Sequence, residues 1–465
     1  MSAITKTSSV EETEVLFASN IDESLKPTPQ EHRVLSPKKF MVMWLGEGLN
    51  MGNITIGSSL FVAGVATLNF AQTLAATLIA LAIISALFSL NGRLAYKTGI
   101  PYVVQIRMSF GMKGGIISSL MRGIPAIVWY GFQSWIGGTA LNEIVKILTG
   151  GKFDSIFICF LILQAVQIVL SMYGFHAIKW VQTVTAVVIM SALIYVLVIL
   201  ITSYSDVMAQ NWVNVKGSWG VPFVASIMLM LGNYAALFVS AADYSRELKT
   251  GISNRKQGLV YLLPLIFSYG FAMIVGSMLS SVTGITNPVK AFAVVVDNPY
   301  ITVFVSVFVI LGVIGVNLVA NIISPAYIIT TLTKNYKVAT IITGLLALGT
   351  FPWVLVKDSS AEGIGLFIGI YSAFLGPILA ILLVDYYFIR KQKVNIKDLY
   401  KVDGPFAGVN PSAVLAMLIG AGAAFIRIDL AWIIGLIVGG IAYFFLTKYA
   451  FKNSIFKKGT IFEKR

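Results

Sequence analysis

The sequence predicts an all-α integral membrane protein with twelve transmembrane helices. Of its 465 residues, 57% are hydrophobic and only 12% are charged, whereas a soluble domain has about 25% charged residues. The apolar residues gather in long runs with almost no charge, and a helix of about 20 such residues can cross the hydrocarbon core of a bilayer. The composition does not supply the polar surface of a soluble protein, so we expect the surface to face lipid.

Twelve segments meet the length requirement for a spanning helix. They are 41–66, 70–92, 114–147, 155–173, 177–203, 219–242, 258–281, 300–325, 337–356, 362–388, 411–427 and 430–449. The third segment is too long for a perpendicular crossing, so we expect it to tilt or to extend beyond the membrane. An even number of spans places both termini on one side.

The net charge of +14 is spread between the apolar runs rather than over one folded domain. If the N-terminus is inside, the expected inner loops carry sixteen Lys and Arg residues and the outer loops carry six. Cytoplasmic loops of membrane proteins are rich in Lys and Arg, so we expect a plasma-membrane protein with both termini in the cytoplasm. A nucleic-acid partner would require a basic face, so we expect none, and the sequence does not tell which proteins, if any, the chain binds.

The chain divides into a core and flanking parts. We expect a cytoplasmic tail over residues 1–36, a ten-helix core over 37–403, two further transmembrane helices over 404–450 and a basic cytoplasmic tail over 451–465. A single cysteine, Cys159, excludes an intrachain disulfide. The two histidines, His32 and His176, lie far apart, so we expect no metal, no cofactor and none of the residue clusters of an enzyme.

Polar residues interrupt the first span, which reads WLGEGLNMGNITIGSS from Trp44 to Ser59. Glycines weaken a helix, and Glu47, Asn50 and Asn53 bring polar atoms to a depth where lipid cannot solvate them. A helix unwound here would free backbone carbonyls for a cation. Close packing through small residues is the alternative, but it does not account for Glu47.

The sixth span has a similar pattern, with Gly232 and Asn233 before the aromatic Tyr234. The interrupted first and sixth spans lie five helices apart, as in transporters built from two inverted repeats with the binding site between the broken helices. Towards the inner end of the sixth span, Asp243 is followed by Arg246. We interpret these two residues as an ion pair at the membrane interface.

Two other spans place polar or aromatic side chains one helical turn apart, on one face. Trp129 and Gln133 in the third span offer a flat surface beside a donor–acceptor pair, although ordinary aromatic packing is an alternative. In the eighth span, Asn317 and Asn321 precede Pro325. Bonding to another helix and ligand binding are both compatible with these two amides.

These spans together could supply two aromatic planes, Trp129 and Tyr234, and three amides, Asn50, Gln133 and Asn321. The aromatic side chains would hold the faces of a flat ring, and the amides would match donors and acceptors along its edge. An unmatched buried polar group costs about 1–3 kcal/mol, so such a site is selective. We expect the substrate to be a small planar heterocycle.

Four blocks of sequence carry a resemblance to a known family. They are KTGIPYVVQIRMSFGMKGG (97–115), WYGFQSWIGGTALNEIVKILTG (129–150), ANIISPAY (320–327) and LGPILAILLVDYYFIRKQK (375–393), the last followed by DLY (398–400). In order and spacing the chain resembles the nucleobase–cation symport-1 family, and most closely its hydantoin transporter branch. The resemblance implies a leucine-transporter-like fold, with ten helices in two inverted repeats plus two C-terminal helices.

The resemblance also implies roles for individual residues. In the family, an indole of the third helix stacks on the substrate, while a glutamine one turn further on and an asparagine of the eighth helix hydrogen-bond to it. The positions that match these roles are Trp129, Gln133 and Asn321. Tyr234 stands where the hydantoin branch has a second stacking tryptophan, Asn50 where it has a glutamine, and Asn233 where it has a glycine.

The sodium site of the family is less well matched. Its carbonyl ligands correspond to Gly46, Leu49 and Gly312. Its two hydroxyl ligands correspond to Gly315 and Val316, which have no side-chain oxygen, and a hard cation needs several oxygen ligands. Glu47 replaces an apolar residue between two carbonyl positions, and burial favours the neutral form of a carboxyl group. We therefore expect H⁺ rather than Na⁺ as the coupling ion, with a Glu47–Arg122 ion pair as the alternative.

The function expected from these features is secondary active transport. The chain would import a nucleobase or related planar heterocycle, such as allantoin, hydantoin, uracil, cytosine or a purine, by cation symport and alternating access. A carrier of thiamine or a similar vitamin with the same fold is the alternative, because thiamine also has a pyrimidine ring and Glu47 could face its cationic group.

Overall fold

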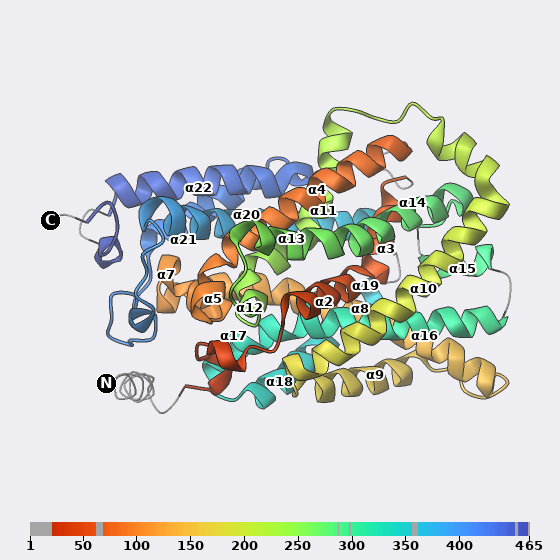
Figure 1. Ribbon diagram of the computed structural model, residues 1–465, viewed down its shortest axis with the longest axis horizontal. Helices are drawn as coiled ribbons and strands as arrows, with labels where there is room; N and C mark the ends of the chain where they lie inside the picture. Colours follow the sequence, from red (N-terminus) through yellow and green to blue (C-terminus); the bar gives the residue numbers. More distant parts are fainter. Residues whose placement is uncertain are drawn as a thin grey trace.

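The computed structural model describes residues 21–61, 68–286, 288–296, 299–355, 361–451 and 454–463. Long helices run along the longest axis of the molecule and pack side by side (Figure 1). Across these described ranges the only β-type pairing is a single bridge between Leu35 and Leu248. The predicted all-α class is therefore confirmed.

Fifteen helices make up the main bundle. They are α2 (Pro37–Gly48), α3 (Met51–Ser59), α4 (Phe70–Asn91), α8 (Met112–Leu148), α9 (Ile156–Ser171), α10 (Phe175–Met208), α11 (Val221–Val239), α13 (Asn254–Leu265), α14 (Phe271–Thr283), α16 (Pro299–Val316), α17 (Ile323–Thr333), α18 (Tyr336–Leu348), α20 (Ala361–Leu383), α21 (Pro411–Ala424) and α22 (Ala431–Tyr449). Short helices connect or extend them: α5 (Arg93–Thr98), α6 (Tyr102–Gln105), α7 (Arg107–Phe110), α12 (Ala241–Ser245), α15 (Pro288–Val295) and α19 (Pro352–Leu355). The remaining turns are 3₁₀ helices, η1 (Glu23–Leu25), η2 (Gln30–His32), η7 (Ile396–Leu399), η8 (Ile428–Leu430) and η9 (Ile455–Lys457), and π-helices, η3 (Ala209–Val213), η4 (Ile266–Gly270), η5 (Asn317–Ile322) and η6 (Val384–Ile389).

Seven helices of the described ranges are long and apolar enough to cross a membrane, and three shorter apolar helices accompany them. The first predicted span does not qualify because it is divided into α2, of 12 residues, and α3, of 9 residues. The third span forms one uninterrupted helix, α8, of 37 residues, which is about 55 Å long at 1.5 Å per residue. The chain is thus a multi-pass helical membrane protein, and the number twelve stays a prediction.

The first span unwinds where the polar residues of the sequence lie. Helix α2 ends at Gly48, and α3 begins at Met51, with Asn50 as its N-cap. The Asn50 side chain accepts a hydrogen bond from the backbone N–H of Asn53 at 3.0 Å. This bond satisfies one of the donors that a helix start leaves unpaired.

The predicted interruption of the sixth span at Gly232 and Asn233 is wrong in position. Helix α11 runs without a break through both residues and ends at Val239, with Ser240 as its C-cap, after which the short α12 continues. A Cβ at Gly232 would lie 2.6 Å from the side chain of Ile368 and 2.8 Å from Ser372 Oγ. The glycine therefore serves close packing against α20, and the break comes two turns later.

The eighth span is continuous but irregular. Between α16 and α17 lies the π-helix η5, which contains both Asn317 and Asn321. A π-helical turn is rare and often marks a functional site. Pro325 follows in the first turn of α17, and because it has no N–H it cannot donate a hydrogen bond to the preceding turn.

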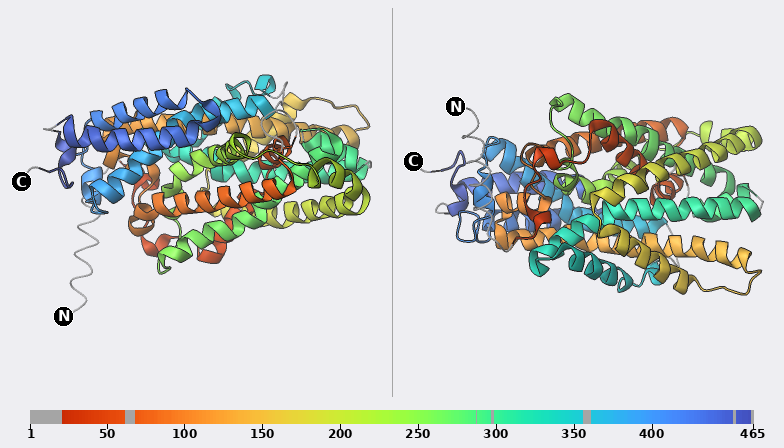
Figure 2. Two further views of the ribbon diagram at one scale, coloured as in Figure 1. Left: turned by 90° about the horizontal axis from the view of Figure 1, so that it is seen from above. Right: turned by 60° about the horizontal axis from the view of Figure 1, so that its bottom comes forward.

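Helix α8 lies at the centre of the contacts and packs against α9, α16 and α17, while α11 packs against α4 and α20. Helix α3 packs against α14. The C-terminal helices α21 and α22 pack against α20 on one side of the bundle, as Figure 1 and the turned views of Figure 2 show.

Residues 21–36 lie against one end of the bundle instead of projecting as a free tail; residues 1–20 lie outside the described ranges. The Arg246 guanidinium donates to the backbone carbonyls of Ser24 at 2.7 Å and of Lys26 at 2.9 Å. Arg33 Nη1 donates to the carbonyls of Tyr96 at 2.7 Å and Leu248 at 3.0 Å. This N-terminal segment therefore covers the ends of α5 and α12.

The C-terminal segment lies at the same end of the molecule. The Tyr400 hydroxyl, next to η7, donates to the Leu25 carbonyl at 2.8 Å, which joins this region to the N-terminal segment. The Arg390 guanidinium donates to the Phe456 carbonyl at 3.0 Å and pairs with Asp385 at 3.0 Å. We call this end of the bundle the termini end.

Candidate functional site

A small cavity lies where the broken first span meets α8, α11 and η5. Its volume is about 40 Å³, which leaves room for only a few water molecules. Its lining residues are Glu47, Asn50, Gly52, Asn53, Trp129, Gln133, Asn233, Tyr234, Ala236, Leu237, Val316, Ala320 and Asn321. All six residues that the sequence suggested for substrate binding therefore meet at one place, together with Glu47.

Side-chain amides hold the break in the first span open. Asn50 Nδ2 donates to the Glu47 carbonyl at 2.8 Å, and Asn53 Nδ2 donates to the Gly48 carbonyl at 2.9 Å. Asn233 Nδ2 then donates to Asn53 Oδ1 at 2.9 Å. This chain of amides joins α3 to α11 and gives carbonyls freed by the unwinding a partner that lipid could not provide.

The carboxyl group of Glu47 points across the cavity to α11. The Tyr234 hydroxyl donates to Glu47 Oε2 at 2.5 Å, and both side chains are about 1% exposed. The ring of Tyr234 packs edge-on against Tyr269 at a centroid distance of 4.7 Å. Contacts with Glu47 and Tyr269 therefore fix the position of Tyr234, and its side chain also lines the cavity.

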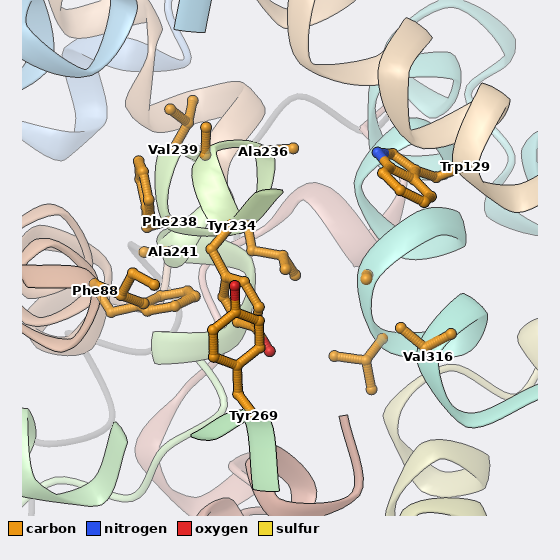
Figure 3. Close-up of a cluster of buried hydrophobic side chains, with 14 of the residues drawn as sticks. Phe88, Trp129, Tyr234, Ala236, Phe238, Val239, Ala241, Tyr269 and Val316 are labelled. Atoms are coloured by element: carbon orange, nitrogen blue, oxygen red, sulfur yellow. The ribbon is translucent and has the colours of Figure 1, made fainter. Parts of the chain in front are cut away.

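Two aromatic walls stand opposite each other. Figure 3 shows Trp129 on α8 facing the space across from Tyr234 on α11. Trp129 contacts Phe132 at 5.5 Å and Phe367 of α20 at 5.8 Å between ring centroids. The indole is thus oriented by packing and is still part of the cavity lining.

The amides at the edge of the cavity differ in how they are bonded. Asn321 Nδ2 donates to Asn317 Oδ1 at 2.8 Å. Asn317 in turn donates to Gln167 Oε1 of α9 at 2.7 Å, so Asn317 bonds helix to helix and Asn321 lines the cavity. Gln133 Oε1 is buried without a hydrogen-bond partner among the described residues, which leaves an acceptor for a bound molecule.

Backbone approaches the cavity closely at Gly52. A Cβ at this position would lie 2.8 Å from Gln133 Nε2 and 3.1 Å from Asn50 Oδ1. Any side chain here would therefore enter the space between the amides. Glycine is required because the turn of α3 forms one wall of the cavity.

The predicted cation positions lie beside the cavity. Gly46 is buried near the end of α2, and Leu49 occupies the break itself. A Cβ at Gly312 of α16 would lie 3.6 Å from the Leu49 carbonyl oxygen, so these two positions are neighbours. The carbonyls of Glu47 and Gly48 already accept amide hydrogen bonds, which reduces the oxygen atoms left for a metal cation.

Two of the ion pairs considered from the sequence are not formed in the part of the chain that the structure describes. Arg122 donates to Ser240 Oγ at 3.0 Å and to the Ala320 carbonyl at 2.9 Å rather than to Glu47. The interpretation of Asp243 and Arg246 as an ion pair is wrong. Arg246 pairs with Glu247 and the N-terminal segment, while Asp243 accepts from the backbone N–H of Tyr102 at 2.7 Å.

Some residues of the site were missed. The sequence marks Asn53 as a polar residue within the membrane but does not predict its hydrogen bond with Asn233. Gln167 was overlooked, although it supports Asn317 and also donates to Ser134 Oγ at 3.0 Å. The fourth span carries two amides, Gln164 and Gln167, among apolar residues, and this pattern is a signal that could have found it.

A broken helix, a π-helical turn and a cavity lined by polar side chains, all within a bundle of apolar helices, are typical of membrane transporters with interrupted helices. The chain belongs to the family described as permeases for cytosine/purines, uracil, thiamine and allantoin, which it matches over residues 27–450. It is a multi-pass transporter and not an enzyme.

Curated relatives cover most of the chain. The allantoin permease of Bacillus subtilis is 29% identical over 463 residues, covering 92% of this chain and 93% of the relative. The hydantoin permease of Microbacterium maritypicum is 26% identical over 444 residues, covering 90% and 86%.

Solved structures show the same fold. The nucleobase–cation-symport-1 family transporter Mhp1, in a closed conformation with bromovinylhydantoin bound, superposes with a TM-score of 0.83 at 24% identity, over 96% of this chain and 98% of that chain. The inward-facing conformation of Mhp1 superposes with a TM-score of 0.79, over 92% and 94%. The chain therefore has the Mhp1 fold.

Replacing Tyr234 by Phe should destabilise the protein. The change keeps the aromatic wall but leaves a buried carboxyl oxygen of Glu47 without its donor, which costs about 1–3 kcal/mol. We expect a lower thermal unfolding midpoint in detergent. Tyr130→Phe is the matched control, because the buried Tyr130 hydroxyl has no partner among the described residues. Equal midpoints for the two variants would show that the Tyr234–Glu47 bond contributes little.

Proposed function

We propose that this chain imports a nucleobase or related planar heterocycle, such as allantoin, hydantoin, uracil, cytosine or a purine, by cation symport. The observation that carries the proposal is the meeting of two aromatic walls and several amides around one cavity. Family membership and the names of the relatives, an allantoin permease and a hydantoin permease, support the same class of substrate.

In this proposal, Trp129 and Tyr234 stack on the two faces of the ring. The amides along its edge would be Asn50, Gln133, Asn233 and Asn321. The free acceptor of Gln133 supports a substrate that carries an N–H group. Because every base has an apolar face and a polar edge, stacking alone would be tolerant and the amides would select the ring.

We further propose twelve transmembrane helices, of which the ten in residues 37–403 form two inverted repeats. The breaks at Leu49 and Ser240 support this arrangement, since both fall in spans five helices apart. The positive loops favour a plasma-membrane orientation with both termini in the cytoplasm. The location of both described chain ends at the termini end of the bundle is compatible with it.

Transport would proceed by alternating access. A cavity of about 40 Å³ is far below the roughly 300–1,000 Å³ of ordinary ligand pockets, so a ring must enter and leave through states in which helices have moved apart. Rocking of one helix group against another around the site supplies such states in transporters with interrupted helices.

Proton coupling through Glu47 is the cation mechanism that we propose. Glu47 lines the same cavity as the aromatic walls and is bonded to one of them, Tyr234. A proton on Glu47 and a ring against Tyr234 would therefore influence each other directly. The carbonyls of Gly46, Leu49 and Gly312 remain candidate ligands for a metal cation, but without side-chain hydroxyls they form a weaker set.

The experiment that tests the function is a radiolabelled uptake panel in membrane vesicles, with proton and sodium gradients imposed separately. We expect saturable accumulation of at least one of the proposed heterocycles and competition among those with a similar edge. Thiamine belongs in the panel because it is the alternative substrate. Uptake of thiamine but of no neutral ring would contradict the proposal.

Replacing Glu47 by Gln should abolish accumulation driven by a pH gradient while leaving exchange of ring for ring. The amide cannot gain and lose a proton, but it can still accept from the Tyr234 hydroxyl. Accumulation and exchange are measured in the same vesicles. Glu143→Gln, on α8 and outside the cavity lining, is the control. Unchanged pH-driven uptake in the Glu47 variant would reject proton coupling at this residue.

A further inference from the structure

Two charged side chains lie buried in the bundle, and nothing in the proposed transport step uses them. Arg122 of α8 and Asp243 of α12 are both 0% exposed. Buried charges are costly unless they are fully paired. These two are only partly paired, so they call for an explanation.

Each of them leaves one polar atom without a hydrogen bond from any described residue. Arg122 uses Nε and Nη2 on Ser240 and Ala320, while its Nη1 has no partner. Asp243 uses Oδ1 on the backbone N–H of Tyr102, while its Oδ2 has none. A free donor on a cation thus accompanies a free acceptor on an anion.

Two neutral side chains complete the group. The Tyr102 hydroxyl is also buried and has no partner within the described ranges. The Ser324 hydroxyl lies beside the Asp243 carboxyl group and interacts with it, and Arg122 lies close to both Tyr102 and Asp243. Helix α6, which carries Tyr102, contacts α8, α12 and α17. We call these four residues the inner polar group.

The inner polar group lies between the cavity and the termini end. Along α8, Arg122 comes seven residues before Trp129, a step of about 10 Å at 1.5 Å per residue. In the opposite chain direction, Asp243 follows Tyr234 and Ser324 follows Asn321. Three parts of the chain therefore each carry one residue that lines the cavity and, nearer to the termini end, one residue of the inner polar group.

Two hydrogen bonds join the helices that lie between the cavity and the inner polar group. Arg122 Nε holds Ser240, the residue at the break of the sixth span, at 3.0 Å. The Tyr244 hydroxyl donates to the Val319 carbonyl in η5 at 3.1 Å. Both bonds join the broken sixth span to α8 or η5, so they must separate if these elements move apart towards the termini end.

We propose that the inner polar group is a second, transient binding site for the transported ring, on its route from the cavity to the termini end. Arg122 Nη1 would donate to a ring carbonyl and Asp243 Oδ2 would accept from the adjacent ring N–H. The carbonyl and the adjacent N–H of a cyclic imide or ureide provide the acceptor and the donor that these two atoms lack. The inference rests on the proposed function and narrows its substrate class.

Charged groups at the second site would bind the ring more strongly than the neutral groups of the cavity do. The cavity holds a ring through neutral amides and stacking, whereas hydrogen bonds to ionised groups are stronger. When the passage opens, a charged pair can therefore draw the edge of the ring away from the amides of the cavity. Because water enters with the opening, the ring is then released from groups that water solvates well.

Asp243→Asn tests the proposal with an almost isosteric change. The Asn oxygen can still accept from the Tyr102 N–H, while the unpartnered acceptor becomes a donor that repels a ring N–H. We measure equilibrium binding of the radiolabelled ring to purified protein and its initial uptake rate into intact cells. We expect unchanged binding and an uptake rate lower by about tenfold or more, the effect of one lost charge-assisted bond.

An analogue methylated at the ring nitrogen next to the carbonyl separates a binding role from a structural one. Its uptake should be the same in wild type and in Asp243→Asn, because it has no N–H to offer. Equal slowing of the ring and the methylated analogue would overturn the proposal, as would an unchanged rate for the unmodified ring.

A pair of tyrosine variants keeps the proposal testable if Asp243→Asn does not fold. Tyr102→Phe and Tyr130→Phe each remove one buried hydroxyl that has no partner among the described residues, but only Tyr102 belongs to the inner polar group. Slower uptake in Tyr102→Phe alone supports the second site; equal rates contradict it. If wild-type protein binds no ring at all, the proposed function fails instead, and the binding assay shows this separately.

Discussion

The constraint on which the structure depends is that polar atoms in the middle of a membrane must find partners inside the protein. The unwound turn at Leu49 frees carbonyls that lipid cannot solvate, and the amides of Asn50 and Asn53 satisfy two of them. Asn233 and Tyr234 then bond to Asn53 and Glu47. Two side-chain bonds therefore join the broken helix to α11 and relate the geometry of the cavity to the position of the sixth span.

The same constraint explains what the cavity leaves open. The side chains of Asn50, Asn53 and Glu47 are bonded within the protein, whereas Gln133 Oε1 has no partner among the described residues. In the proposed function, a ring in this space would supply the missing donor. Because the cavity is small, the proposal requires the helices to move apart before a ring can enter.

The sequence predicted the site better than the course of the helices. The break at Asn50 follows from glycines and amides, and the spacing of Trp129 and Gln133 places both on one face. The predicted break at Gly232 was wrong because a glycine in a helix can allow close packing as well as unwinding. Only the neighbouring Ile368 and Ser372 show that it serves packing here. The predicted ion pair of Asp243 with Arg246 was wrong because Arg246 donates to carbonyls of the N-terminal segment, more than 200 positions away. Such long-range partners leave no trace in local spacing.

Binding of the accepted heterocycle to a Gly52→Ala variant tests the central claim most directly, since a Cβ there would lie 2.8 Å from Gln133 Nε2, inside the proposed ring site. We expect the affinity to fall by about tenfold or more, a loss of about 1.4 kcal/mol, while the unfolding midpoint stays near that of Gly422→Ala, whose Cβ meets no atom within 4 Å. Wild-type affinity in a folded Gly52→Ala protein would contradict it, because the ring would then bind elsewhere.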